Sequence, residues 1–298
     1  MTSVAPEAFL VDRVPRAVFS VTGERPLGYL HDVLAQDVAE LTPGRGAIAA
    51  VLTANGRVAA EVRVLPLGDG VLLDAEEPAR PGIIEHIARH APLAGVDVSD
   101  AGDRFALAAL RGLGSDAALA AAGLPVPGAD EASVEPEGDV LIVRVVWGGP
   151  GVDLLGPPEA VAAAVARIEV RRASLADLDA ARIAARRPRY GADVTEELLV
   201  NETPLLLHGV SMSKGCYPGQ ESVARIHNLG RVRRSIRGLR SDAPLKPGSE
   251  VLVDGGESVG RVTSAAGGSV AIALLAAQIP AGTVVRIDGI EAVVEALT

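Results

Sequence analysis

The stretch 47–65, AIAAVLTANGRVAAEVRVL, contains two apolar runs that meet at Asn55-Gly56. Asn-Gly between apolar runs is the strongest short-range signal for a β-hairpin. The stretch therefore predicts a β-hairpin with strands at 47–53 and 58–65. Around this hairpin the pattern predicts further strands at 17–22 and 70–75, and helices at 26–41 and 81–91.

Pairs of strands with single helices recur farther along the chain, without the regular alternation expected of a doubly wound sheet. Ser174 is a favourable N-cap for a helix at 174–186. Segment 123–138 is rich in Pro, Asp and Glu and is expected to be an exposed loop. This pattern predicts the α+β class, with helices packed on one face of antiparallel sheets. The other expected elements are strands at 94–98, 104–111, 139–147 and 151–155, and helices at 114–122 and 157–169.

The character of the sequence changes from Ile236 onwards. Short strand-like runs follow one another, with turn signals such as Gly255-Gly256 and Asp288-Gly289 between them. Many short, evenly spaced strands are typical of a small β-barrel. We therefore expect a C-terminal barrel over 235–298 and an α+β region over 1–234, the latter in two lobes at about 1–100 and 101–234.

The composition excludes several classes of protein. The chain has 298 residues and a formal net charge of −10, which disfavours general nucleic-acid binding, because phosphate binding depends on Lys and Arg. No segment approaches the ~20 apolar residues that span a bilayer, so no membrane partner is expected. A single cysteine, Cys216, excludes an intrachain disulfide and a cysteine-based metal site within one chain. No secretory signal is recognised, which favours a cytoplasmic location.

Two other patterns are compatible either with a binding site or with ordinary surface residues. Arginines recur between Arg225 and Arg240, either as alternate outward positions of a strand or as a local basic pocket. His86 and His90 lie four residues apart on an expected helix and could face one metal ion. No third ligand is evident nearby, so solvent-facing histidines are expected and no metal site is predicted.

The segment 213–221, SKGCYPGQE, combines tight turns with reactive side chains. Two glycines and a proline within six residues exclude a regular helix or a central strand there. A cation beside a thiol lowers the pKa of the thiol, so Lys214 could activate Cys216. Gln220 and Glu221 offer donors and acceptors suited to a planar heterocycle. The alternative is a turn that contains a buried structural thiol.

The segment 214–221, KGCYPGQE, resembles the signature of the YgfZ family, Lys-Gly-Cys-Tyr-x-Gly-Gln-Glu, at all seven fixed positions. The similarity continues through Val223-Ala224-Arg225 and Gly230. Upstream, RPRYGAD at 187–193 and NETP at 201–204 resemble segments shared with the aminomethyltransferases of the glycine-cleavage T-protein type. The resemblance covers nearly the whole chain and is strongest at 182–234.

The resemblance implies a GcvT-like three-lobed body around a folate-sized channel, with ferredoxin-like α+β lobes and a small C-terminal β-barrel. It also implies binding of tetrahydrofolate or a one-carbon folate derivative. The expected partners are iron–sulfur proteins or their assembly factors, in cluster assembly or repair. An association with tRNA modification would then be indirect, without direct nucleic-acid contact.

The resemblance and the residue chemistry together select candidate site residues. Cys216 is the candidate reactive thiol, and Glu202, or else Glu221, is the carboxylate expected to accept the paired N–H groups of a pterin. Tyr190 is expected to stack on the ligand, or else to be an ordinary rim or core tyrosine. The folate tail is anionic and suits Arg225 and Arg231. The remaining candidate cofactor-binding residues are Lys214, Gly215, Tyr217, Gly219 and Gln220.

One departure from the enzyme branch separates three hypotheses. Aminomethyltransferases of this type carry an Asp-Asp pair shortly after the Gly turn, where this chain has Ala60 and Glu61. Alanine cannot transfer a proton. The leading hypothesis is therefore a folate-binding accessory factor for iron–sulfur proteins. The second is a true folate-dependent aminomethyltransferase or demethylase, and the third is a folate-free interaction module.

Overall fold

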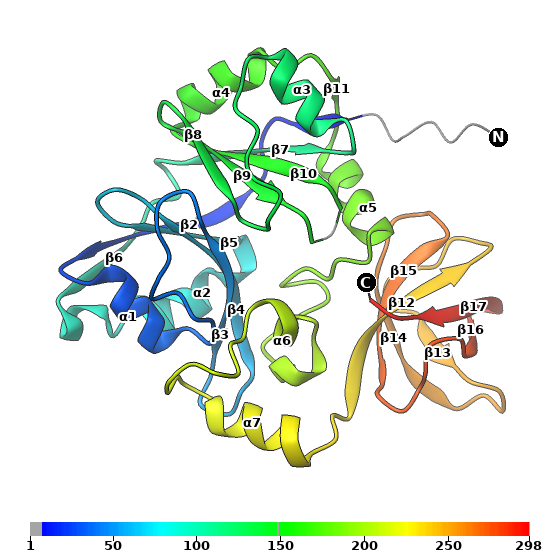
Figure 1. Ribbon diagram of the computed structural model, residues 1–298. Coiled ribbons are helices and arrows are strands. Elements are labelled where there is room, and N and C mark those ends of the chain that lie inside the picture. Colours follow the sequence, from blue (N-terminus) through cyan, green and yellow to red (C-terminus); the bar gives the residue numbers. More distant parts are fainter. Residues whose placement is uncertain (1–7, 148, 298) are drawn as a thin grey trace.

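The structure is a computed structural model that describes residues 8–147 and 149–297 (Figure 1). Two lobes built on β-sheets lie at the left and the top of Figure 1, and a barrel lies at the right. Helix α5 (Leu175–Ala184) and the long connector after it, residues 185–233, run between these three parts. The mixed α/β architecture and the closed C-terminal barrel confirm the expected fold class.

The first lobe contains a five-stranded antiparallel sheet in the order β3-β4-β5-β2-β6. The predicted hairpin is confirmed: β3 (Ala47–Leu52) pairs antiparallel with β4 (Val58–Pro66), and Gly56 in the turn has φ +76°. Three further strands complete the sheet: β2 (Arg16–Gly23), β5 (Val71–Glu76) and β6 (Val96–Asp100). Its short helical segments are α1 (Pro26–Val33), α2 (Arg80–Ile83), a π-helical turn (Ile84–Ala88) and the 3₁₀ turns Glu77–Ala79 and Ala91–Ala94.

The second lobe contains a six-stranded sheet in the order β11-β1-β7-β10-β9-β8. Helices α3 (Ser115–Ala121) and α4 (Pro158–Ala166) contribute to a separate apolar core with Leu110, Ile142 and Leu154. The strands are β1 (Phe9–Val11), β7 (Ala106–Arg111), β8 (Val134–Glu137), β9 (Val140–Val145), β10 (Gly151–Gly156) and β11 (Arg171–Arg172).

The connector returns to the first lobe. Its buried side chains Tyr190, Val200 and Val223 belong to the same apolar core as the first sheet. The core of the first lobe therefore contains residues from both sides of position 100, and β1, near the N-terminus, belongs to the sheet of the second lobe. The two lobes thus do not correspond to two consecutive stretches of the sequence. The connector contains a 3₁₀ turn (Val200–Glu202), α6 (Leu205–His208) and α7 (Gln220–Leu229).

The C-terminal strands close into the predicted barrel, in the order β12-β15-β14-β13-β16-β17. Inward-facing residues such as Leu239, Val262 and Val294 fill it. Closure leaves no unpaired edge, because β12 pairs with both β15 and β17. The strands are β12 (Arg234–Ser241), β13 (Glu250–Leu252), β14 (Ser258–Ala265), β15 (Val270–Ala276), β16 (Val284–Ile287) and β17 (Ile290–Glu295).

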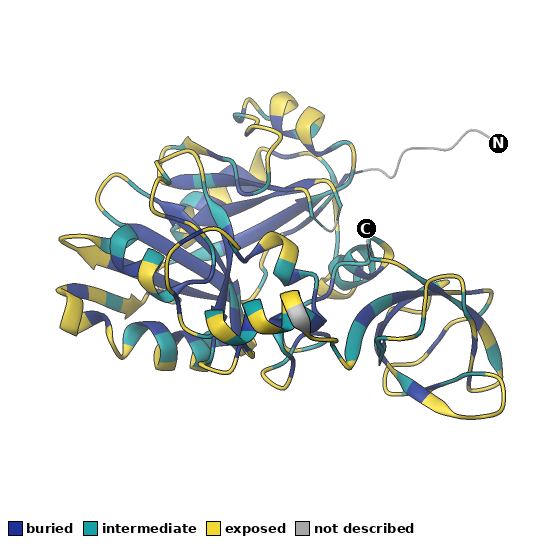
Figure 2. Cartoon of the chain, turned by 60° about the horizontal axis from the view of Figure 1, so that its bottom comes forward, coloured by how far each residue is buried: buried dark blue, intermediate teal, exposed yellow. Residues whose placement is uncertain are grey.

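The two sheets share an apolar interface. Val18 and Leu72 of the first sheet and Leu107 and Val143 of the second belong to one buried cluster. Figure 2 shows the strands of both sheets mostly buried, while exposed residues lie on the loops and the outer sides of the helices. A cavity at this junction is therefore bordered by strands of both sheets.

Three expected elements differ from the structure. The helix expected at 26–41 ends at Val33, and Leu34 is already extended. The arginine run at 225–240 begins on helix α7 and becomes a strand only from Arg234. The loop expected at 123–138 contains the edge strand β8, where Pro136 is tolerated because an edge strand has a side without ladder hydrogen bonds.

Candidate functional site

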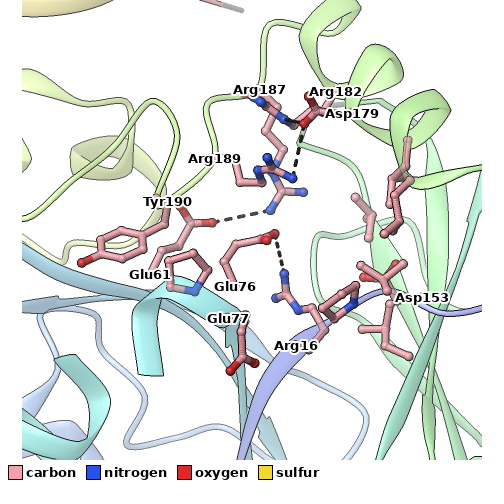
Figure 3. A pocket seen from close by; sticks show the side chains of 18 of the residues that line it. Arg16, Glu61, Glu76, Glu77, Asp153, Asp179, Arg182, Arg187, Arg189 and Tyr190 are labelled. Carbon is pink, nitrogen blue, oxygen red and sulfur yellow. Dashed lines mark hydrogen bonds and ion pairs between the residues drawn. The ribbon is translucent and has the colours of Figure 1, made fainter. Parts of the chain in front are cut away.

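A cavity of about 320 Å³ lies between the two sheets and the start of the connector (Figure 3). Strands β4 and β5 line it from the first lobe, β7 and β10 from the second, and α5 with residues 187–191 closes the remaining side. The cavity shares lining residues with an open trough of about 850 Å³ that reaches Arg13 and Arg80. Its charged lining residues are Arg16, Glu61, Arg63, Glu76, Glu77, Arg111, Asp153, Asp179, Arg182, Arg187 and Arg189.

The alternation of β4 decides which of its side chains reach the cavity. Successive side chains of a strand point to opposite faces. Glu61 and Arg63 line the cavity, whereas Ala60 and Val62 are fully buried in the core of the first lobe. A carboxylate is therefore present on the cavity face at position 61, while alanine at position 60 occupies the core-facing position.

Glu61 is a largely buried carboxyl group whose one ion-pair partner among the described residues is distant. Its side chain is 14 % exposed, and its Oε1 lies 3.5 Å from Nη2 of Arg187. Burial raises the pKa of the Glu61 carboxyl above its ordinary value, and the neighbouring Glu76 raises it further, against the opposing effects of Arg187 and Arg16. A carboxyl group with a raised pKa can hold or release a proton nearer neutral pH.

Arg187 is held in place from the second lobe. It donates a hydrogen bond of 3.1 Å to the carbonyl of Trp147, and its guanidinium carbon lies 5.1 Å from the centre of the Trp147 ring. Trp147 in turn stacks on His208 of α6, with ring centroids 4.4 Å apart. Burial lowers the pKa of His208, which favours the neutral imidazole in this stack.

Tyr190 is the one expected site residue that lines the cavity. It is 8 % exposed, and its hydroxyl donates a 2.7 Å hydrogen bond to the carbonyl of Ala59. Burial raises the pKa of its phenol to about 12, so it stays protonated. Figure 3 shows Tyr190 beside Glu61 at one end of the cavity.

A chain of alternating charges crosses from one sheet to the other at the cavity. Arg16 donates to Asp74 at 2.8 Å, and Asp74 also accepts from Arg63 at 2.6 Å. Arg63 and Arg111 then both donate to Asp153 of β10 at 2.6 Å. These arginines hold the pKa values of both aspartates below the ordinary range against the cost of burial. Strands from the two lobes are thereby tied together beside Glu61.

The loop 213–221 packs against the first lobe and contributes no residue to the cavity lining. Nζ of Lys214 donates to the carbonyls of Leu34 at 2.8 Å, Gln36 at 3.3 Å, and His31. The ammonium group therefore caps the end of α1, a role that the sequence did not predict. Cys216 is exposed with a free thiol, and its reactivity stays a prediction.

The other residues of this loop shape the turn into α7. Tyr217 is buried in the core of the first lobe, and the ammonium of Lys214 lies 5.4 Å from its ring centre. The side-chain amide of Gln220 is within hydrogen-bond distance of the carbonyls of Lys214 and Gly215. Gly219 has φ +84°, and Glu221 is exposed in the first turn of α7.

Glu202, Arg225 and Arg231 lie outside the central cavity. The carboxylate of Glu202 is 3 % exposed, accepts from the backbone N–H of Leu199 at 3.0 Å, and pairs with Arg234 at 3.3 Å. It lines a separate hollow together with Arg231. Arg225 is exposed on α7. The structure thus does not bring Glu202 and Tyr190 into one cavity, and the carboxylate beside Tyr190 is Glu61.

No group of three or more His, Cys, Asp or Glu side chains among residues 8–147 and 149–297 is arranged to hold a metal ion. In the same part of the chain, every helix is too short or too polar to span a bilayer.

Comparisons with known proteins give relatives along most of the chain. No family model matches it. It is 26 % identical to the tRNA-modifying protein YgfZ of Pectobacterium carotovorum over 238 residues, which are 78 % of this chain and 70 % of that protein. The YgfZ protein of Colwellia psychrerythraea is 23 % identical over 79 % of the chain and 72 % of its own length.

Two eukaryotic relatives match more closely over shorter stretches. The human mitochondrial iron–sulfur cluster assembly factor IBA57 is 42 % identical over 74 residues, 23 % of this chain and 20 % of its own length. The chloroplastic putative transferase At1g60990 of Arabidopsis thaliana is 39 % identical over 87 residues, 29 % of this chain and 20 % of its own length. These two matches therefore span about a fifth of each relative.

A solved structure shows the same fold over nearly the whole chain. The glycine cleavage system aminomethyltransferase T from Bartonella henselae superposes with a TM-score of 0.85 at 23 % identity, over 98 % of this chain and 86 % of that one. The fold is thus that of the aminomethyltransferases, whereas the relatives by sequence include YgfZ proteins and IBA57.

Proposed function

We propose that this chain, which belongs to the YgfZ family, binds a reduced folate in the central cavity and supports the assembly or repair of iron–sulfur proteins. The observation that carries the proposal is the meeting of Glu61, Tyr190 and Arg187 at one cavity between the lobes. The support for iron–sulfur clients comes from the similarity to human IBA57, which is named as an iron–sulfur cluster assembly factor.

The donor set of the cavity fits a pterin ring. The ring presents two adjacent N–H donors, which a carboxylate can accept together. Glu61 has acceptor capacity for them, because its one ion-pair contact among the described residues is the 3.5 Å approach of Arg187. Tyr190 supplies an aromatic face beside it, and a volume of about 320 Å³ is at the small end of ligand pockets.

The folate tail needs cations, and the cavity opens towards them. Arg189 lines the cavity, is 41 % exposed, and pairs with Asp179 at 3.3 Å. Arg13 lines the adjoining trough. We therefore assign the folate tail to this trough, in place of the expected contacts with Arg225 and Arg231. The bound folate would supply one-carbon chemistry, and the protein would orient the ring through the ionised carboxylate of Glu61.

Calorimetric titration of tetrahydrofolate under anaerobic conditions tests the cavity. We expect Glu61→Gln to weaken binding at least ~10-fold, which is about 1.4 kcal/mol. Glu202→Gln serves as the matched variant, because its carboxylate is engaged by Leu199 and Arg234 outside the cavity. A loss with Glu202→Gln alone would move the folate to the other hollow. No binding by the wild-type protein would remove folate from the function.

The client role has its own test. In cells that lack the protein, activity of an iron–sulfur enzyme should be restored by the wild type and by Arg286→Ala, a barrel-surface control. Cys216→Ala should fail if the exposed thiol participates. Restoration by Cys216→Ala would remove the thiol from the proposal. Formation of methylene-tetrahydrofolate from an aminomethyl-lipoyl carrier would instead favour the aminomethyltransferase hypothesis.

A further inference from the structure

An open groove lies between α7 and the barrel, outside the central cavity. It consists of two adjoining hollows of about 590 and 660 Å³, which share Ile226, Arg231, Val232 and Arg233. Arg57 and Arg234 line one end, and Asn201 and Gln278 line the other. We call this surface the α7 groove. In Figure 1, α7 lies at the bottom of the molecule, beside the chain that leads into the barrel.

The α7 groove is cationic on an acidic protein. Four arginines line it against two carboxylates, Glu197 and Glu202, and Glu202 is already paired with Arg234. Arg231 and Arg233 are exposed, and within the described residues neither makes an ion pair. The whole chain has a net charge of −10, but charges are screened beyond ~8 Å at physiological salt. Locally, the groove therefore attracts anions.

One end of the groove concentrates two guanidinium groups. Arg57 and Arg234 both donate to the backbone carbonyl of Glu197, Arg234 at 3.2 Å. Their mutual repulsion is offset by one carboxylate, that of Glu202, which lies 3.3 Å from Arg234. A carboxylate from outside could pair with both arginines without displacing a buried charge.

The floor of the α7 groove is apolar. Leu199, Leu206, Ile226 and Val232 line it and are partly exposed to solvent. The amide of Asn201 donates to Val223 at 3.3 Å, but within the described part of the chain its buried Oδ1 accepts no hydrogen bond. The groove thus combines a cationic rim, apolar contacts and an unused acceptor.

We propose that the α7 groove docks an extended acidic peptide segment of a partner protein that carries aliphatic side chains between its carboxylates. Carboxylates pair with the arginine rim, aliphatic side chains cover Ile226 and Val232, and a backbone N–H supplies the donor for Asn201. A helix the length of α7 is about 15 Å long, which an extended segment of about five residues matches.

The same features disfavour nucleic acid as the occupant. A phosphodiester backbone has no N–H donor and no aliphatic side chain. Single-stranded nucleic acid also gains affinity by stacking on aromatic side chains, and the described lining of the groove contains none except His227.

Fluorescence anisotropy with the full chain tests this proposal. The probe is a labelled eight-residue peptide with six glutamates flanking two leucines, and its glutamine counterpart is the control ligand. Arg231→Ala/Arg233→Ala should weaken binding at least ~10-fold. The matched control Arg225→Ala/Arg286→Ala removes the same charge from α7 and the barrel outside the groove lining, and should leave affinity within ~2-fold. All four arginines are exposed, so neither double variant is expected to be much less stable than the wild type. Melting temperatures check that both variants are folded.

Five results would overturn the proposal. Four of them are no binding of the acidic peptide, equal binding of the glutamine peptide, an equal loss in both double variants, and displacement of the peptide by transfer RNA at lower concentration than by unlabelled peptide. Displacement by tetrahydrofolate would also overturn it, by assigning the groove to the folate. Failure of folate to bind anywhere would leave the peptide result standing, so the two proposals fail separately.

Discussion

Glu61 of β4 and Arg187 of the connector face each other across the central cavity, with Oε1 and Nη2 3.5 Å apart. Among residues 8–147 and 149–297, neither side chain makes another ion pair, and Arg187 otherwise contacts the carbonyl and the aromatic ring of Trp147. The pair joins the first lobe to the segment that leads from the second lobe, and it holds a carboxyl group where a ligand can reach it.

The raised pKa of Glu61 predicts that Glu61→Gln stabilises the protein at pH 7. The native state binds this proton more tightly than the unfolded chain, so the contribution of Glu61 to stability falls as the pH rises above the ordinary carboxyl pKa of about 4.3. The advantage of the variant should therefore shrink as the pH falls towards 4. Denaturant unfolding at several pH values measures it, and a variant less stable than wild type at pH 7 would contradict the prediction.

Asp153→Asn should destabilise the protein by about 3 kcal/mol, because it leaves Arg63 and Arg111 buried without their shared counter-charge. The folded-state pKa of Asp153 is depressed, so its stabilisation is present above the ordinary value of about 3.9 and is lost as the pH falls below it. Calorimetric melting between pH 3 and 7 measures this. Asp116→Asn, an exposed partner of Arg144, should cost less than about 1 kcal/mol, and equal costs would contradict the prediction.

Lys214→Met should cost about 3 kcal/mol, since the carbonyls of Leu34 and Gln36 at the end of α1 lose a charged donor. Methionine keeps most of the aliphatic stem, so the loss comes from the ammonium group. Urea unfolding measures the change, with Lys246→Met on the exposed barrel surface as the control. A change below about 1 kcal/mol would mean that solvent replaces the capping bonds.

The same capping bonds explain one limit of sequence reasoning. The apolar spacing at 26–41 continues past Val33, so periodicity alone predicts a longer helix. The chain instead turns to pair with β3, through the 2.9 Å bond from Ala35 to Ala50, and Lys214 satisfies the freed carbonyls. A partner 180 residues away in the chain, which spacing cannot reveal, ends the helix.

Turns and helix caps could be predicted from the sequence where neighbouring residues alone determine them. Asn55-Gly56 predicted the hairpin, Ser174 and Asp177 form the capping box that starts α5, and the short strands after Ile236 close into a barrel. The site was harder to predict from the sequence, because Tyr190 and Glu61 meet only through the packing of the connector on β4. The available signal was two charged residues, Glu61 and Arg63, at alternate positions of an apolar strand.

Gly219→Ala tests whether the loop that carries Cys216 depends on a close backbone approach. Gly219 has φ +84°, and a Cβ there would lie 2.5 Å from the carbonyl oxygen of Thr53 in the β3–β4 turn. Because that oxygen belongs to the backbone and cannot swing aside, we expect a loss of at least about 2 kcal/mol. Gly215→Ala is the matched control in the same loop, since a Cβ there meets nothing within 4 Å. Urea unfolding compares the two, and equal stability of both variants would show that the loop can move away from the hairpin.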